Sequence, residues 1–332
     1  MNKFILFKPV GLGKIGFFSN KNLMLFKQIP KLAKSAEVKP VKNHFLRSNI
    51  EILQSSLNPF KTTGRFFSSS TRSSIFDKGN VWKNYNKYYG NSQWDRLKGP
   101  AIFTALFCVG TTLLVPVLFN YTPLAIYKRS PSLLIYTIIG LNGLVFLMWQ
   151  SPSFFTFLTK FGLLFKDKVY SNWSMLGSAF SHQSFVHILC NMFVLQSFGT
   201  TLCSIIGPAN FLIMYLNSAV ISSFISILVP TLARTSMSVG SLGASGAIFS
   251  VVGTFSYLIP KAPIALFFIP IPGGAWIAFL GSVAYNVAGV AFRWGSFDYA
   301  AHLGGSLAGV LYGWWYSKKL QQRRARVRHV GF

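Results

Sequence analysis

The sequence predicts an all-α polytopic membrane protein. Of its 332 residues, 51% are hydrophobic and only 11% are charged, which is too little charge for a soluble globular protein. Residues 100–317 contain two acidic residues, Asp167 and Asp298. Their apolar stretches are long enough to cross a hydrocarbon layer of about 30 Å. In lipid every backbone polar group must be bonded within its own segment, so we expect these stretches to be helices.

Seven apolar stretches qualify as membrane-spanning helices. The first, within residues 100–120, precedes a core of six helices in residues 132–317, and residues 318–332 form a basic tail. Four prolines between the fifth and sixth stretches predict a rigid connection there. The expected helices cover residues 101–119, 133–150, 185–206, 209–229, 242–259, 274–292 and 299–316.

Positive charge is concentrated at the two ends of the chain. The formal net charge is +26, with 18 of the 32 basic residues in residues 1–99 and six more in residues 318–328. Such charge often indicates nucleic-acid binding, but these basic residues flank an apolar bundle and form no zinc-finger or aromatic-basic RNA-binding motif. We therefore expect contact with anionic lipid head groups of the bilayer and no nucleic-acid partner.

Residues 1–75 have the composition of a mitochondrial transit peptide. They contain thirteen Lys and Arg against two acidic residues and many Ser, whereas a secretory signal would have a continuous apolar core. Residues 64–70 resemble a cleavage site for matrix processing enzymes. The alternative to a transit peptide is that residues 1–75 are a disordered basic tail that is not cleaved. Residues 76–99 are polar and aromatic, which suits a matrix-side or interfacial segment before the first helix.

Three polar clusters interrupt the third, fifth and seventh stretches. An unpaired polar group in hydrocarbon costs several kcal/mol, so such residues indicate function. Alternate helices of an up-and-down bundle begin on the same side of the membrane, so the clusters should share one side, about one to two turns deep. The clusters are His182 with His187 and Asn191, then Ser245, and then His302.

The spacing within the first cluster predicts which of its residues act together. His187 and Asn191 are four residues apart and share a helix face, so we expect them to act as a pair. His182 precedes His187 by five residues, which on a helix would point it about 140° away, toward the rim of the site.

Small residues around the other two clusters predict close helix packing. Gly243 and Gly246 flank Ser245, while Gly305 and Gly309 follow His302 and form a GxxxG motif. Close packing of these two helices would carry His302 to within hydrogen-bonding distance of Ser245.

The clusters together suggest a serine hydrolase that works within a membrane. His302 would act as the base for Ser245, while the Ser245 backbone N–H, His187 and Asn191 would donate to the oxyanion. Asp298 lies one turn before His302, where helix capping is its expected role, so we predict a Ser–His dyad and not a triad. Phe249, one turn after Ser245, is a candidate to stack on the imidazole and orient it.

The spacing of these residues resembles that of the rhomboid intramembrane serine proteases. The stretches FSHxSxxHxxxNMxVLxSFG and SLGASGAI are similar to the mitochondrial, presenilin-associated rhomboid-like branch. The family patterns are GxSG, HxxxxHxxxN and AHxxG, which occur here as residues 243–246, as His182, His187 and Asn191, and as Ala301, His302 and Gly305.

The resemblance implies a fold and a set of roles. The fold is a six-helix rhomboid core with one additional N-terminal transmembrane helix. Ser245 is the implied nucleophile, His302 the base, and His187 with Asn191 part of the oxyanion hole, while His182 matches a position that is more often structural. Residues 274–292 and 293–298 are candidates for a lateral gate. No metal or cofactor is expected, and Cys108, Cys190 and Cys203 are interpreted as apolar side chains within helices.

The resemblance also implies an activity, a location and partners. It implies an endopeptidase of the mitochondrial inner membrane that cleaves single-span membrane proteins, including dynamin-like GTPases of membrane fusion and, in fungi, a cytochrome c peroxidase precursor. If the N-terminus stays in the matrix, the polar clusters face the matrix. Two other classes of protein are alternatives. One is a catalytically silent rhomboid-like protein that binds clients, and the other is a transporter or channel. Silent relatives typically lack the serine or the histidine, and no inverted repeat is visible.

Overall fold

The computed structural model describes residues 93–233, 240–266, 269–295 and 297–330. These residues belong to a unit that comprises Asp77–Phe332. The predicted transit peptide, residues 1–75, and most of the predicted polar segment, residues 76–92, lie outside the described residues and stay predictions.

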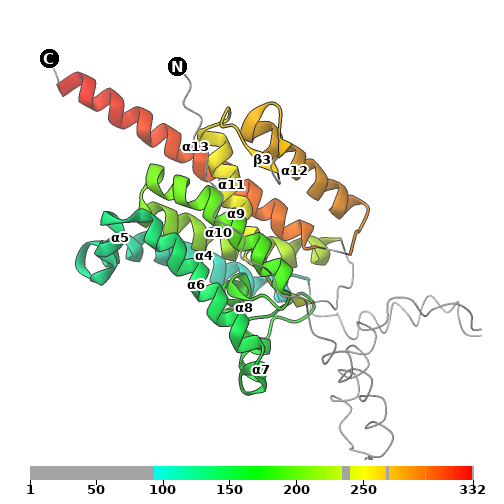
Figure 1. The fold of residues 1–332 in the computed structure, drawn as a ribbon. Coiled ribbons are helices and arrows are strands. Elements are labelled where there is room, and N and C mark those ends of the chain that lie inside the picture. The colour runs from blue at the N-terminus through cyan, green and yellow to red at the C-terminus, as the bar shows by residue number, and fades with distance from the viewer. Residues whose placement is uncertain (1–92, 234–239, 267–268, 296, 331–332) are drawn as a thin grey trace, which may run out of the picture. The chain divides into compact units, whose positions relative to one another are not determined.

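Seven long helices coincide with the seven predicted stretches in the described part of the chain (Figure 1). Five of them, α4, α6, α9, α10 and α12, are long and apolar enough to cross a membrane, and α11 is a shorter apolar helix. The predicted all-α polytopic membrane fold is confirmed. The helices are α4 (Gln93–Tyr121), α6 (Pro131–Trp149), α9 (Phe185–Ile206), α10 (Pro208–Leu232), α11 (Ser245–Leu258), α12 (Gly274–Ala291) and α13 (Tyr299–Val330).

The first and last helices are longer than the sequence predicted. α4 begins at Gln93 and continues through Pro100, so the end of the predicted polar segment is helical. Its polar first turns are held by contacts with a distant loop, because Arg96 donates to the carbonyl oxygen of Asp167 at 2.6 Å. α13 continues to Val330, since residues 317–330 contain no Gly or Pro and consist mainly of good helix formers. The predicted boundary at residue 317 marks where the apolar sequence ends, not where the helix ends.

Short elements connect the long helices. β1 pairs antiparallel with β2, and β3 pairs antiparallel with β4. β3 and β4 lie in the proline-rich connection between α11 and α12, whose rigidity stays a prediction. The short elements are η1 (Pro123–Ala125), α5 (Ile126–Arg129), η2 (Pro152–Phe154), α7 (Phe155–Phe161), β1 (Leu164–Phe165), α8 (Ser174–Gly177), η3 (Ser178–Phe180), β2 (Gly240–Ser241), β3 (Ala265–Leu266) and β4 (Ile269–Pro270).

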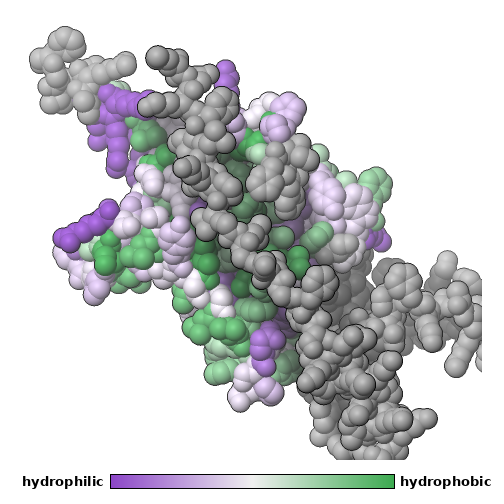
Figure 2. Space-filling model, in the orientation of Figure 1, coloured by the Kyte–Doolittle hydropathy of each residue, from purple (hydrophilic) through white to green (hydrophobic). Residues whose placement is uncertain are grey.

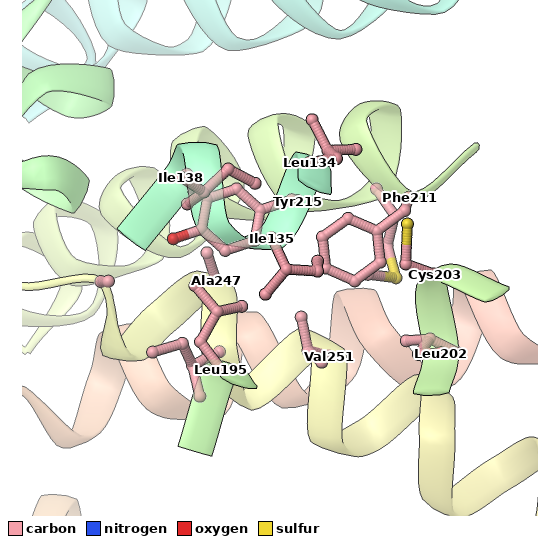
Figure 3. Close-up of a cluster of buried hydrophobic side chains, with 14 of the residues drawn as sticks. Leu134, Ile135, Ile138, Leu195, Leu202, Cys203, Phe211, Tyr215, Ala247 and Val251 are labelled. Atoms are coloured by element: carbon pink, nitrogen blue, oxygen red, sulfur yellow. The ribbon is translucent and has the colours of Figure 1, made fainter. Parts of the chain in front are cut away.

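The helices pack around α10, α11 and α13. α13 contacts α10, α11 and α12, while α6 packs on α9 and α4 packs on α10. Four of these helices meet in a cluster of fully buried side chains that includes Ile135, Leu195, Tyr215 and Val251 (Figure 3). The outer faces carry exposed apolar residues such as Leu113 of α4, as expected for helices that face lipid.

The additional helix α4 contacts both the core and the loop before α9. Its Thr111 hydroxyl donates to the Asn217 side chain of α10. Phe103 and Phe107 pack edge-on against Trp173, with ring centroids 5.3 and 6.5 Å away. α4 is therefore part of the same packed unit as the six helices that follow it.

Candidate active site

The structure brings Ser245 and His302 into direct contact. Oγ of Ser245, the first residue of α11, lies 2.8 Å from Nε2 of His302, the fourth residue of α13. The absence of side chains at two glycines allows this approach. A Cβ at Gly305 would lie 1.9 Å from the Gly246 carbonyl oxygen, and one at Gly309 would lie 2.3 Å from the Ser250 carbonyl oxygen. α11 and α13 therefore approach each other closely at these glycines.

The three polar clusters lie on one side of the bundle, as predicted, but nearer to the helix ends. His187 is the third residue of α9, Ser245 the first of α11 and His302 the fourth of α13, so these three residues lie in the first turn of their helices, whereas Asn191 lies in the second turn of α9. The prediction of one to two turns was too deep because it began the Ser245 helix at residue 242. Gly243 has a φ of +128°, which is incompatible with a right-handed helix, so α11 begins only at Ser245.

The imidazole of His302 is held in one tautomer by Asn286 of α12. Oδ1 of Asn286 lies 2.8 Å from Nδ1 of His302, and Nδ2 of Asn286 donates to the Ser282 carbonyl oxygen at 2.8 Å. This second bond places the amide oxygen toward the ring. An amide oxygen can only accept, so Nδ1 carries the proton. Nε2 is therefore the acceptor for the Ser245 hydroxyl, as a general base requires.

Phe249 also orients the imidazole. Its ring stacks on that of His302 with centroids 4.4 Å apart and planes inclined by 25°. Asp298 makes the predicted helix cap, because its Oδ1 accepts from the Ala301 backbone N–H at 3.1 Å. Asn286, and not an acid, is thus the hydrogen-bond partner of the His302 Nδ1.

His187 and Asn191 lie beside Gly243, two residues before Ser245. A Cβ at Gly243 would lie 2.7 Å from Cε1 of His187 and 3.8 Å from Nδ2 of Asn191, so both side chains pack against the loop before Ser245. The Ser245 N–H is the first in its helix and has no acceptor within that helix. This N–H, the positive end of the helix dipole and the two side chains form a place that suits an oxyanion.

His182 is not at the rim, as the sequence suggested, but is completely buried. Its Nε2 lies 2.9 Å from Nδ2 of Asn191 and accepts from the Ala244 backbone N–H at 3.3 Å. The helical spacing did not apply, because α9 begins at Phe185 and the backbone of Ser184 is extended. Burial, together with the neighbouring His187, lowers the pKa of His182 to about 3. The ring is therefore neutral and positions Asn191 and the loop before Ser245.

Comparison with known proteins agrees with this geometry. Residues 170–319 match the rhomboid domain family. The chain contains a rhomboid domain. It is 54% identical to Rhomboid protein 1, mitochondrial, from Saccharomyces cerevisiae over 212 aligned residues. The aligned region covers 64% of this chain and 61% of that protein. It is 40% identical to the presenilin-associated rhomboid-like protein, mitochondrial, from Rattus norvegicus over 177 aligned residues. This region covers 53% of this chain and 46% of that protein.

The relatives place this rhomboid domain in the mitochondrial branch. The presenilin-associated rhomboid-like protein A, mitochondrial, from Danio rerio is 38% identical over 176 residues, which is 53% of this chain and 45% of that protein. The chain thus spans between about half and three fifths of the length of these curated relatives. Together with its apolar helices, these similarities support a mitochondrial multi-pass membrane protein.

The rhomboid domain contains two features of the site that the sequence did not reveal. Asn286 was treated as part of an apolar helix, although an amide in a membrane helix is itself a signal of function. Asp298 was expected only to cap α13, but it also forms an ion pair with Lys166 at 3.0 Å. In the described part of the chain, no group of three or more His, Cys, Asp or Glu side chains is placed to hold a metal ion.

Proposed function

We propose that this rhomboid domain is an intramembrane serine endopeptidase of the mitochondrial inner membrane. The observation that carries the proposal is the hydrogen bond of 2.8 Å between Ser245 Oγ and His302 Nε2. The Asn286 contact supports it, because it leaves Nε2 as the nitrogen that can take the serine proton. A catalytically silent client-binding protein is less favoured, because both residues are present and in contact.

The geometry supports a two-step hydrolysis of a peptide bond. Ser245 Oγ attacks the substrate carbonyl carbon while His302 Nε2 takes its proton, and the oxyanion is stabilised by the Ser245 N–H, His187 and Asn191. The C–N bond then breaks, and His302 gives the proton to the leaving amine. Water attacks the acyl-enzyme with His302 again as base, and the proton returns to Ser245 Oγ as the acid product leaves.

The position of the dyad suggests the class of substrate. It lies in the first turn of two membrane helices, so the scissile bond would lie near one edge of the hydrocarbon layer. Carbonyl groups of a helix are bonded and shielded, so the client must unwind locally, which small or helix-destabilising residues favour. We propose single-span inner-membrane proteins as clients, including the dynamin-like GTPases and cytochrome c peroxidase precursor implied by the resemblance.

The orientation of α4 supports a proposal for the side on which the dyad lies. The first turn of α4 contacts Asp167, two residues after β1, and β1 pairs with β2, which ends four residues before Ser245. The start of α4 is therefore on the dyad side. If the residues before α4 remain in the matrix, the dyad opens to the matrix. In mitoplasts, a tag before α4 should be protected from protease and a tag after α13 should be digested, and the reverse pattern would contradict this orientation.

The end of α13 suggests a lipid partner. Figure 2 shows hydrophilic residues gathered where α13 extends beyond the other helices. Lys318 and Lys319 lie over the half-exposed rings of Trp314 and Trp315, with Nζ 4.3 and 4.7 Å from the ring centroids. Basic residues beside interfacial tryptophans favour anionic head groups, which we propose as the bilayer partner.

The activity can be tested with purified protein in liposomes that contain a model transmembrane substrate. We expect the wild type and Ser197→Ala to cleave, because Ser197 is exposed and bonds only to its own helix. Ser245→Ala and His302→Ala should not cleave, and a fluorophosphonate probe should label Ser245. Equal cleavage by all four proteins would refute the proposed dyad. Client binding without cleavage by the wild type would favour the silent alternative.

A further inference from the structure

Asp298 is the meeting point of four separate elements. Its Oδ2 accepts from Nζ of Lys166 at 3.0 Å and from the hydroxyls of Ser226 and Ser241. Its Oδ1 accepts from the Ala301 N–H at 3.1 Å. These partners lie beside β1, in α10, in β2 and in α13. A helix cap alone would need only the last of these contacts.

Two of the four contacts lead directly to the candidate dyad. Ser241 is four residues before Ser245 in the chain, and Ala301 immediately precedes His302. The carbonyl oxygen of Asp298 also accepts from the His302 backbone N–H at 3.1 Å. One residue therefore holds both the segment that leads to the candidate nucleophile and the helical turn that carries the candidate base.

The cation of Lys166 stabilises the Asp298 carboxylate, which is largely shielded from water. The Lys166 and Asp298 side chains are only 9% and 14% exposed. Burial by itself raises the pKa of Asp298, but Lys166, the two hydroxyls and the Ala301 N–H lower the pKa below its ordinary value. A buried ion pair adds little net stability, although it strongly disfavours any arrangement in which the two charges separate. The pair thus favours one relative position of the segments that it joins.

We infer that Asp298, paired with Lys166, is a positioning residue that holds the Ser245 segment and the His302 turn in register. The inference rests on the proposed protease function. The carboxylate does not touch the reacting atoms, and it acts through Ser241 and through the start of α13. Arg96 of α4 bonds to the carbonyl of Asp167, next to Lys166, so the additional N-terminal helix supports the same segment.

The test compares variants in liposomes that contain a model transmembrane substrate. Asp298→Asn keeps the size and the capping ability of the side chain but removes its negative charge, and Lys166→Met removes the cation that pairs with it. Ser241→Ala removes one hydrogen bond to Asp298 and keeps the ion pair. Lys98→Met is the matched control, because Lys98 forms an exposed ion pair on α4. The folded fraction, kcat, KM and the rate of fluorophosphonate labelling are measured for each protein.

We expect kcat and the labelling rate of folded Asp298→Asn and Lys166→Met to fall about tenfold to a hundredfold, the loss typical of a misplacement of about 1 Å. KM should change little, because substrate contacts are intact. Ser241→Ala should lose several-fold in kcat while it folds normally, and Lys98→Met should match the wild type. Asp298→Glu, which restores the charge, should recover part of the lost kcat.

Three outcomes separate this inference from the proposed function. If Ser245→Ala abolishes cleavage but folded Asp298→Asn and Lys166→Met keep wild-type kcat and labelling, the positioning role is wrong and the protease function stands. If the charge variants do not fold, wild-type kcat in Ser241→Ala overturns the inference. If Ser245→Ala cleaves like the wild type, the proposed function itself is wrong.

Discussion

Replacement of Gly305 by alanine should separate the two helices that carry the candidate dyad. The added Cβ would lie 1.9 Å from the Gly246 carbonyl oxygen, whereas ordinary contacts begin at 3.4 Å. This neighbour is backbone, so it cannot rotate away as a side chain would. α11 and α13 must therefore move apart by about 1.5 Å, the difference between these two distances.

The movement should cost much activity and moderate stability. The Ser245 Oγ to His302 Nε2 distance is 2.8 Å, and an increase of even about 1 Å would break this bond and lower the rate about a hundredfold. Overpacking of a close interface costs about 1–3 kcal/mol in the free energy of unfolding. We expect Gly305→Ala to fold with a lowered unfolding temperature and to lose most of its kcat.

The assay measures kcat on a model transmembrane substrate in liposomes together with thermal unfolding. Gly281→Ala is the matched control, because a Cβ at Gly281 of α12 would meet nothing within 4 Å. An alanine there should keep wild-type kcat and should stabilise the helix by about 0.5–1 kcal/mol. Wild-type kcat and probe labelling in Gly305→Ala would refute the argument that this glycine sets the distance between Ser245 and His302.

Three further predictions concern the surroundings of the dyad. Asn286→Leu should fold but lose about tenfold to a hundredfold in kcat, because the His302 Nδ1 loses the acceptor that orients it; unchanged kcat would contradict this role. Gly243→Ala should lose activity and stability together, since its φ is +128° and its Cβ would lie 2.7 Å from the His187 ring; normal unfolding and activity would oppose this. Because burial lowers the pKa of His182 from 6.5 to about 3, the unfolded chain binds an extra proton below pH 6.5, so stability should fall from there toward pH 3. Unfolding measured against pH should be less steep in His182→Gln, and equal slopes would count against a buried neutral ring.

The helices were predictable because their signal is local. Seven apolar stretches between polar connections gave seven helices, since a membrane permits few other ways to satisfy the backbone. The helix ends were less predictable, because they depend on distant contacts such as Arg96 with Asp167 at the start of α4. The end of the apolar sequence was also mistaken for the end of α13, whose basic residues continue the helix.

The site was predictable where residues share a motif and unpredictable where they meet through packing. Ser245 and His302 were found from their clusters and the glycines beside them. His182 was misplaced, because a helical angle was applied to a residue that precedes α9. Asn286 was missed, because its contact with His302 depends on how α12 lies against α13, and no spacing in the sequence reports that arrangement.

The neutral amide of Asn286 leads to a last prediction about charge. A carboxylate at this position would still accept from Nδ1 and would stabilise the imidazolium that the proposed mechanism forms. It would also be buried without a cation, because Lys166 is already paired with Asp298, and such a charge costs several kcal/mol. Asn286→Asp should therefore keep or raise kcat in the folded protein and lower its unfolding temperature. A folded but inactive Asn286→Asp would mean that the amide does more than accept a hydrogen bond from His302.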